Sequence, residues 1–398
     1  MNKIKYIAIT IALLCAAAHA QYTEITDRLV YTNGITTNLT AVAFRNRNFY
    51  NGGGIYMSSS TVTVHNALFE TNSAFNLGGA IFMNSNSTLT VDNTSFVGNT
   101  ASNISGGAIY NNRGTVTISN STFTGNSAPS DPGGGAIYNY DGAVTLTDVS
   151  FYNNTVTSTD TGSGGAISSR GTGSGSVTLN VSAGNISTIS GNRAVNGNGI
   201  YIGSGSLIVN TIDDGVLDMQ DAMDVRTSST VTKNGTGQWK VGGTNSISSS
   251  GLFSVNEGEL FLYEDAVMDV QNISFDVDTV LTLSADSRMN ATNLTLADGV
   301  TLGFREGSYL GLGTGTVGDD LLFNIILNIG DYFTVTGINN GNVFDQLEAA
   351  YAAGTFDINR VSGVVTALTD VVPEPTAVLM LASVAGVVGL YRRFFCKL

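Results

Sequence analysis

The sequence predicts an all-β protein folded as a parallel β-helix, a solenoid in which each coil of the chain stacks on the previous one. Three repeated features support this prediction. The first is a glycine phrase, Gly-Gly-x-Ile or a close variant, whose isoleucines stand at positions 55, 81, 109, 137, 167 and 200. The spacing is nearly regular and lengthens slowly along the chain. A recurring period of about 20–50 residues is the signature of a solenoid.

The other two features are a short alternating segment and a phenylalanine motif. Threonines alternate with aliphatic residues in segments 61–64, 88–91 and 115–118, and a fourth copy occupies 143–146. Such alternation places the aliphatic side chains on one face and the hydroxyls on the other. Each segment is followed by Phe-x-x-Asn. Each repeat thus offers about three short strands, with connections too short for a helical crossover.

Two columns of asparagines are expected to form structural ladders between coils. One contains Asn66, Asn93 and Asn120, and the other contains Asn72, Asn99, Asn126 and Asn154, both at an almost constant spacing. Coils stacked about 4.8 Å apart bring identical amides within hydrogen-bonding distance. Asparagine also tolerates the left-handed backbone that sharp bends require. We therefore expect a structural rather than a catalytic role.

The alternation of Gly-Gly-Ala-Ile with Phe-x-x-Asn resembles the repeats of polymorphic outer membrane proteins over about residues 44–204. Three positions depart from the pattern: Arg47 replaces asparagine, Ile189 replaces phenylalanine and Asn198 replaces glycine. The resemblance implies a right-handed β-helix, like an autotransporter passenger. It also implies exposure on the surface of a Gram-negative bacterium and a role in adhesion.

The start of the chain has the features of a secretory signal peptide over residues 1–20. Two lysines precede an apolar run that ends in Ala18-His19-Ala20, so cleavage is expected between Ala20 and Gln21. Residues 21–51 are then expected to form an N-terminal cap and the first coil. Residues 52–204 form the regular repeats.

Beyond residue 204 the glycine phrase fades while the alternation continues. Residues 205–335 are therefore predicted to form a less regular β-helix, and residues 233–262 resemble the autotransporter-associated β-strand repeat of passenger domains. At about 27 residues and 4.8 Å per coil, the body would contain about 11 coils over some 50–55 Å. Residues 336–370 are expected to cap the last coil with a helix over 342–353 and a strand over 360–368.

Residues 371–398 carry a sorting motif. Its positions are Val372, Pro373, Glu374 and Pro375, then Arg392 and Arg393 after an apolar run over 376–390. The run is short for a hydrocarbon core of about 30 Å, and the trailing arginines fit the positive-inside rule. The segment resembles the PEP-CTERM signal. This resemblance implies a C-terminal hydrophobic sorting helix, transient membrane anchoring, processing by an exosortase, and delivery to the cell surface, often beside exopolysaccharide.

Composition excludes several classes of function. The chain has 17 Lys and Arg against 31 Asp and Glu, a net charge of −14, and its cations are scattered, which argues against nucleic-acid binding. Without the signal peptide, His65 is the only histidine and Cys396 the only cysteine. We predict no cofactor and no metal site. Weak calcium binding by an acidic cluster is left as an alternative; its members are Asp213, Asp214, Asp218, Asp221 and Asp224.

A candidate ligand stripe follows the isoleucines at Tyr56, Phe82, Tyr110 and Tyr138. Neighbouring residues on a strand point to opposite sides, so an exposed stripe would suit sugar rings or a host or neighbouring cell surface. A bend that buries both columns is the alternative. We predict a non-catalytic structural or adhesive surface protein. A carbohydrate-active enzyme (lyase or hydrolase) and an ice-binding β-solenoid, the latter based on the Thr-x-Thr rows, are the alternative functions.

Overall fold

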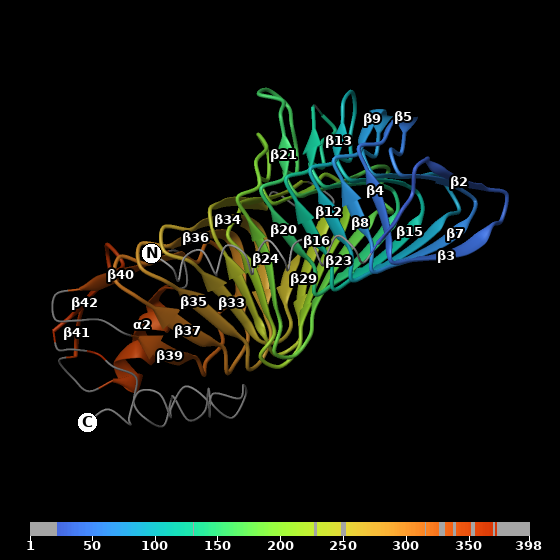
Figure 1. Ribbon diagram of the computed structural model, residues 1–398. Coiled ribbons are helices and arrows are strands. Elements are labelled where there is room, and N and C mark those ends of the chain that lie inside the picture. The colour runs from blue at the N-terminus through green and yellow to red at the C-terminus, as the bar shows by residue number, and fades with distance from the viewer. Residues whose placement is uncertain are drawn as a thin grey trace, which may run out of the picture.

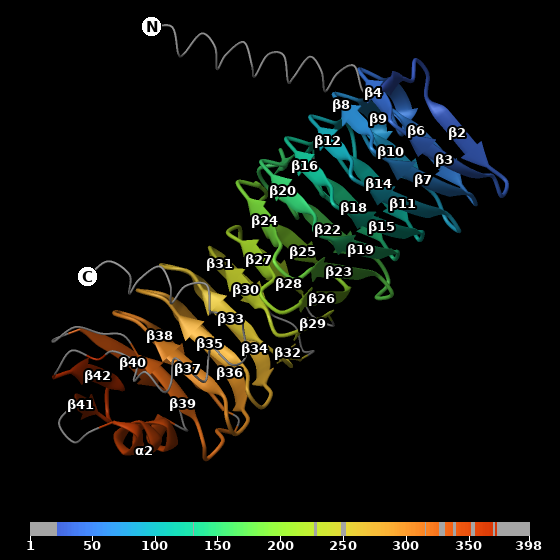
Figure 2. The ribbon, with the colours of Figure 1, turned by 60° about the horizontal axis from the view of Figure 1, so that its bottom comes forward.

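The computed structural model confirms an all-β solenoid of parallel strands (Figures 1 and 2). It describes residues 22–129, 131–226, 229–247, 252–314, 316–325, 331–336, 340–351, 355–368 and 371. The strands lie in sheets of 13, 24 and 5 strands, called sheets A, B and C here. Within the described ranges, α2 (Asn340–Ala350) is the only helix.

Sheets A and C each take one strand from a coil. Sheet A contains β1 (Thr23–Glu24), β4 (Val42–Arg45), β8 (Leu68–Glu70), β12 (Ser95–Val97), β16 (Thr122–Thr124), β20 (Ser150–Tyr152), β24 (Ile186–Ser190), β27 (Val216–Met219), β30 (Gln238–Val241), β33 (Glu259–Leu262), β35 (Val280–Leu283), β37 (Thr301–Phe304) and β39 (Leu322–Ile325). Sheet C contains β5 (Asn48–Asn51), β9 (Ser73–Leu77), β13 (Thr100–Ala101), β17 (Ser127–Ala128) and β21 (Thr155–Val156).

Sheet B has two columns of strands that merge near its C-terminal end. The first column holds β2 (Leu29–Thr32), β6 (Ile55–Ser58), β10 (Ile81–Met83), β14 (Ile109–Asn112), β18 (Ile137–Tyr140), β22 (Ile167–Arg170), β25 (Ile200–Ile202), β28 (Met223–Val225) and β31 (Thr244–Ile247). The second holds β3 (Thr36–Thr40), β7 (Thr61–His65), β11 (Thr88–Asp92), β15 (Thr115–Ser119), β19 (Ala143–Thr147), β23 (Ser176–Val181), β26 (Gly205–Thr211), β29 (Ser229–Asn234) and β32 (Phe253–Val255). β34 (Val267–Phe275) and β36 (Arg288–Leu296) span both columns, and β38 (Tyr309–Gly311), β40 (Tyr332–Thr336), β41 (Phe356–Asn359) and β42 (Val364–Ala367) complete the sheet.

A coil of the repeat region contains four strands, as in β6, β7, β8 and β9. The expectation of about three strands is therefore wrong here. The residues between the motif asparagine and the glycine phrase form the additional strand, which belongs to sheet C. We call these residues the arm of each coil. Figure 1 shows the arm strands β5, β9, β13 and β21 projecting from one side of the solenoid.

The core is built from columns of identical side chains in register. The six phrase isoleucines pair coil to coil, and each is fully buried. The motif phenylalanines stack from Phe44 to Phe151 with ring centroids 4.5 to 4.9 Å apart. The third residue of the phrase is Gly or Ala because the position faces the phenylalanine column: even a Cβ at Gly54 would lie 3.1 Å from the rings of Phe44 and Phe69.

The coils become shorter after the repeat region. On sheet A, Leu217 pairs with Trp239 and Trp239 with Leu260, and the column continues through positions 281 and 302. The predicted coil length is too long for this part, because these coils have no arm. Sheet A accordingly has 13 strands rather than about 11. Twelve spacings of about 4.8 Å give roughly 58 Å.

The last coil is followed by α2 and a hairpin. Val343, Phe344 and Leu347 of α2 are buried in the common core. The Gln346 side chain accepts from Leu321 N at 2.6 Å and donates to Gly318 O at 2.7 Å. The segment expected as one strand over 360–368 is instead part of a hairpin, in which β42 pairs antiparallel with both β41 and β40.

Two of the predicted features lie outside the described residues. These are the signal cleavage site at Ala20 and Gln21, and the sorting motif with its hydrophobic helix, from Val372 to Arg393. Among the residues that the structure does describe, no helix has the length and apolar character needed to span a membrane.

Candidate binding surface

The buried column of asparagines lies at the base of the arms, directly before each arm begins. Asn72 Nδ2 donates to Asn99 Oδ1 at 2.9 Å, and the same bond at 2.9 Å links each following pair as far as Asn192. The backbone N of each of these donors also donates to that oxygen. The other Nδ2 hydrogen is donated to a phenylalanine carbonyl of the preceding coil, as from Asn99 to Phe69 at 2.9 Å. This chain of amides is buried and internally satisfied.

The chain of amides ends on a carboxylate. Asn192 donates from N and Nδ2 to Asp221 Oδ2 at 2.9 and 2.7 Å. Met223 pairs with Ile200, the isoleucine of the last glycine phrase. Asp221, two residues before Met223, therefore occupies the place in its coil that the glycine phrase has in the coil before. The first coil without an arm thus supplies the missing acceptor. Burial raises the pKa of Asp221, and the bonds from Asn192 oppose this rise.

The other predicted column, at Asn66, Asn93 and Asn120, contains the left-handed bends, with φ of 50°, 47° and 48°. Asn93 Nδ2 donates to Asn66 Oδ1, whereas Asn120 Nδ2 donates to Asp92 Oδ1 at 2.9 Å. In the buried column, the left-handed residue is the one before the asparagine, at Thr71, Gly98, Gly125 and Asn153. The expectation of a left-handed asparagine therefore applies only to the first column.

A further amide ladder on sheet B was not foreseen from the sequence. Asn210 donates to Asn180, Asn234 to Asn210 and Asn256 to Asn234, each from Nδ2 to Oδ1 at 2.8 to 2.9 Å. The spacing between these asparagines is irregular, and this conceals the ladder. The ladder could be found only from the neighbouring residues, because each asparagine directly follows a buried residue such as Leu179 or Val209.

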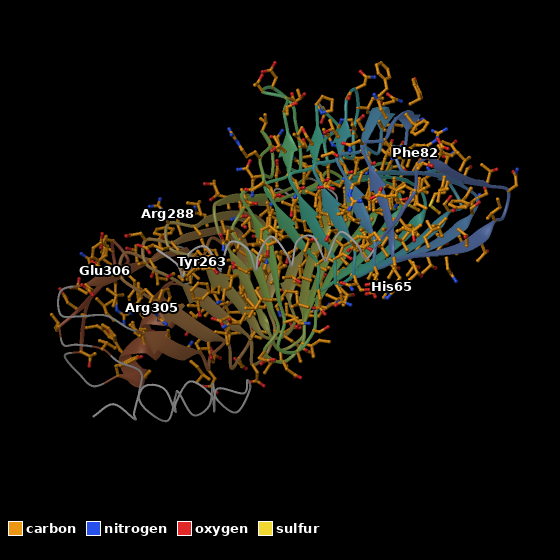
Figure 3. All side chains as sticks on the ribbon, in the orientation of Figure 1. His65, Phe82, Tyr263, Arg288, Arg305 and Glu306 are labelled. Carbon is orange, nitrogen blue, oxygen red and sulfur yellow. The ribbon has the colours of Figure 1, made fainter. Side chains whose placement is uncertain are left out.

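The candidate ligand stripe is a stack of largely covered rings. Ring centroids lie 5.2 Å apart from Tyr56 to Phe82, 5.6 Å from Phe82 to Tyr110 and 5.1 Å from Tyr110 to Tyr138. Phe82 is 6% and Tyr138 is 3% exposed, and the other two are half-buried. Burial raises the pKa of the Tyr110 and Tyr138 hydroxyls. Figure 3 shows Phe82 close to the arms.

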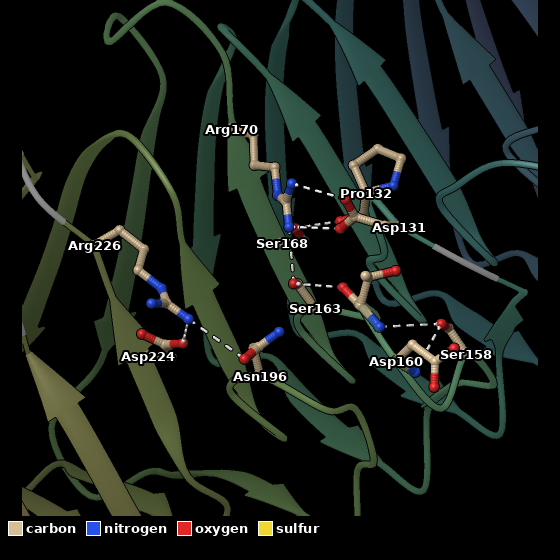
Figure 4. A network of polar contacts seen from close by, with 11 residues as sticks. Asp131, Pro132, Ser158, Asp160, Ser163, Ser168, Arg170, Asn196, Asp224 and Arg226 are labelled. Atoms are coloured by element: carbon tan, nitrogen blue, oxygen red, sulfur yellow. Dashed lines mark hydrogen bonds and ion pairs between the residues drawn. The ribbon is translucent and has the colours of Figure 1, made fainter.

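The arms pack against the outer face of the first column of sheet B (Figure 4). Ser168, which pairs with Tyr138 in the stripe, donates from Oγ to Pro132 O at 2.9 Å. Arg170 Nη2 donates to Asp131 Oδ1 at 2.6 Å and to Ser163 Oγ at 2.8 Å. The guanidinium carbon of Arg170 also lies 4.6 Å from the Tyr201 ring centroid. The outer face of sheet B beside the stripe is thus in contact with the arms at Ser168 and Arg170.

The threonine rows lie on the outer face of the second column. Thr61, Thr88 and Thr115 pair in register, as do Thr63, Thr90, Thr117 and Thr145, and all are partly or fully exposed. Ala143 interrupts the first row. Beside these rows, His65 Nδ1 and Asp92 Oδ2 lie 2.8 Å apart, away from the arms (Figure 3).

The acidic residues between 213 and 224 do not converge on one point. Asp218 on sheet A accepts from the Tyr263 hydroxyl at 2.7 Å, whereas Asp224 on sheet B pairs with Arg226 at 2.7 Å. Asp221 belongs to the amide ladder, and Asp214 Oδ1 accepts from Gly184 N at 2.5 Å. The described part of the chain contains no group of three His, Cys, Asp or Glu side chains placed to hold a metal ion.

The fold and these surfaces define a parallel β-solenoid with phenylalanine and asparagine ladders and a row of stacked arms. A comparison with family models finds the Chlamydia polymorphic membrane protein repeat at residues 120–140 and 148–170. This confirms the resemblance for two successive coils. Comparisons with curated proteins and with solved structures found no match. The repeats and the solenoid together indicate a surface-exposed protein similar to an autotransporter passenger.

Proposed function

We propose that this protein is a non-catalytic structural or adhesive solenoid on the surface of a Gram-negative bacterium, associated with extracellular polysaccharide. The observation that carries the proposal is the row of arms. Among the described residues after 204, the coils stack in parallel without arms, so the arms are not needed to build a solenoid. They add a projecting sheet whose role lies outside the core.

The proposed route to the surface uses both ends of the chain. A signal peptidase would cut after Ala20, and an exosortase would recognise Val372-Pro373-Glu374-Pro375 and cut the chain near it. Mass spectrometry of the protein recovered from native cells tests this route, with an expected start at Gln21 and an end between 372 and 375. Arg392→Ala with Arg393→Ala should leave the tail attached. An intact tail on the wild-type surface protein would contradict the proposal.

Adhesion and catalysis can be separated with the protein recovered from the cell surface. We expect cells that lack the protein to retain less matrix and to adhere less well, and complementation to restore both. We also expect no release of reducing ends or unsaturated products when the protein is incubated with the cells' own polysaccharide. Release of either product would favour the polysaccharide lyase or hydrolase alternative.

A further inference from the structure

Two aromatic rings lie on the outside of the arms. Tyr50 on β5 is 63% exposed and Phe75 on β9 is 57% exposed. Their rings stack with centroids 5.7 Å apart and planes inclined at 26°. The stripe and the motif phenylalanines form similar stacks, but those are covered or buried. The solenoid core gains nothing from these exposed rings, and a stacked pair on the surface offers a flat apolar face to a ligand.

The backbone at this pair is irregular in a way that orients the rings. Phe49 pairs with Ala74 and Asn51 pairs with Leu77, so Tyr50 alone faces two residues of β9. Such a β-bulge is common at sheet edges and redirects a side chain. On the same strand, Phe49 lies under the Arg28 guanidinium, whose carbon is 4.9 Å from the ring centroid. β5 therefore carries one covered ring and one exposed ring.

The arm segments around the pair are amide-rich and carry no charged side chain of their own. Residues 48–51, 73–77 and 100–105 include no Asp, Glu, Lys or Arg. Asn48 is exposed, and next to the Phe75 position Asn103 Nδ2 donates to Asn76 Oδ1 at 3.1 Å. Amides offer both donors and acceptors, as the hydroxyls of a sugar require. The two arginines beside these segments, Arg28 over Phe49 and Arg47 just before β5, donate to the backbone carbonyls of Asn51 and Thr26.

We propose that Tyr50 and Phe75 form a binding site for a neutral glycan on the arms. The apolar face of a sugar ring would pack on the aromatic rings, and its hydroxyls would bond to the neighbouring amides. The inference rests on the proposed adhesive function and names its ligand class and its site. It also moves the site away from the stripe at Tyr56, whose rings are largely covered.

The test uses the full processed chain in affinity electrophoresis. Gels contain dextran, hydroxyethylcellulose or galactomannan as neutral probes, and alginate as an anionic probe. We expect at least one neutral polymer to retard the wild-type protein and alginate to leave it unretarded. Tyr50→Ala with Phe75→Ala should weaken the neutral binding by roughly tenfold or more, as for truncated aromatic anchors. The control is Ile186→Ala on sheet A, which removes another exposed side chain (65%) and should not change binding.

Unchanged neutral binding in the double variant would overturn the site while leaving the adhesive function in place. Retardation by alginate alone would overturn the ligand class. A wild-type dimer that the double variant abolishes, measured by light scattering, would reassign the rings to an interface between copies. Loss of matrix retention in cells lacking the protein, with no binding to any polymer, would overturn the glycan site alone. Normal retention in those cells would overturn the proposed function itself.

Discussion

The long coils with arms and the short coils without them share one core but differ at one corner. On sheet A, the core column passes without a break from Phe151 through Ile189 and Met219 to Val241. The two kinds of coil differ in the segment that leads from sheet A to the first column of sheet B. In a long coil this segment runs from residue 123 to residue 137, whereas in a short coil it runs only from 219 to 223. The glycine phrase and the buried asparagine accompany the longer path. They are therefore the means of attaching an arm, and not of building a solenoid.

The short coils make their corners with local turns. Ala266 N donates to Tyr263 O at 3.0 Å around Asp265, whose φ is 59°. The same turn recurs one coil later at Asp286 and in the next coil at Gly307, with φ of 52° and 68°. A left-handed third residue is what such β-turns require, and Asp, Asn or Gly supplies it. These three corners need no buried amide, unlike the preceding one, where buried Asn245 donates from Nδ2 to Gly242 O at 2.9 Å.

The largest effect should come from a methyl group at the second glycine of the phrase. In Gly107→Ala, the new Cβ would overlap Gly135 O and lie 2.5 Å from Ser127 N, which are both backbone atoms of neighbouring segments. Backbone atoms cannot move aside as a flexible side chain can. We expect a loss of more than about 4 kcal/mol in the free energy of unfolding, measured by denaturant titration.

Gly125→Ala is the matched control for that substitution. Gly125 has a φ of 64°, but nothing lies within 4 Å of its Cβ position. Its cost should be only the left-handed backbone penalty of about 1–2 kcal/mol. Equal losses in the two variants would show that the arm does not pack as closely on the glycine phrase as the structure describes.

The next largest effect should come from breaking the buried amide ladder. Asn126→Ala removes the acceptor of Asn99 N and Nδ2 and the donor to Phe96 O. A buried group left unpaired costs about 1–3 kcal/mol. Asn99 Nδ2 keeps its bond to Phe69 O, so the other two groups predict a loss of at least about 2 kcal/mol in thermal or denaturant unfolding. Asn234→Ala in the outer ladder should cost less than about 1 kcal/mol, because water can reach that half-buried amide. The reverse order would contradict the difference in burial.

The core of the long coils was predictable because the same motifs recur in the sequence. Four copies of both motifs at nearly constant spacing fix the columns of Ile109 and Phe123, and the structure has these columns. The period of the short coils was missed, since their signal is a single Asp or Gly at each corner, such as Asp265. Such a signal is too weak to be separated from ordinary turn composition without knowing the register.

The surface was less predictable than the core, because it depends on contacts between different parts of a coil. Alternation places Phe82 opposite Ile81, but it does not tell whether other parts of the coils cover Phe82. The exposure of Tyr50 depends on a one-residue shift in register, and no sequence pattern on β5 predicts this shift. Asp221 replaces an asparagine from a different position in its coil, so no alignment of repeats would find it.

At the junction of the two kinds of coil, Asp221→Asn should be tolerated and Asp221→Ala should not. The ladder shows that an asparagine oxygen can accept both bonds that Asn192 makes. The alanine variant leaves Asn192 N and Nδ2 without their acceptor and should lose about 1–3 kcal/mol. The asparagine variant should match or slightly exceed the wild type at pH 7. A large loss in Asp221→Asn would mean that the charge itself holds the junction.

The pH dependence of the stability gives a second test of the role of Asp221. Burial raises the pKa of Asp221 in the folded protein above its usual value of 3.8. Its contribution to stability is then fully present below pH 3.8 and is lost as the pH rises through the folded pKa. Relative to Asp221→Asn, the wild type should therefore lose stability as the pH rises above 3.8. Chemical denaturation at several pH values measures this difference.

The smallest effect, and the opposite sign, is expected at Asp92 on the long coils. Its carboxylate accepts from Asn120 Nδ2 at 2.9 Å and from Ser119 Oγ at 2.7 Å, and these bonds, with His65, lower its pKa. Its contribution is thus present above pH 3.8 and is lost as the pH falls through the folded pKa. Because the side chain is 33% exposed and solvent screens its interactions, Asp92→Asn should cost less than about 1 kcal/mol at pH 7. The cost of Asp92→Asn should shrink below pH 3.8, where the stability of Asp221→Asn also approaches that of the wild type. A cost of Asp92→Asn that grew on acidification would show that the carboxylate is not the acceptor at this corner.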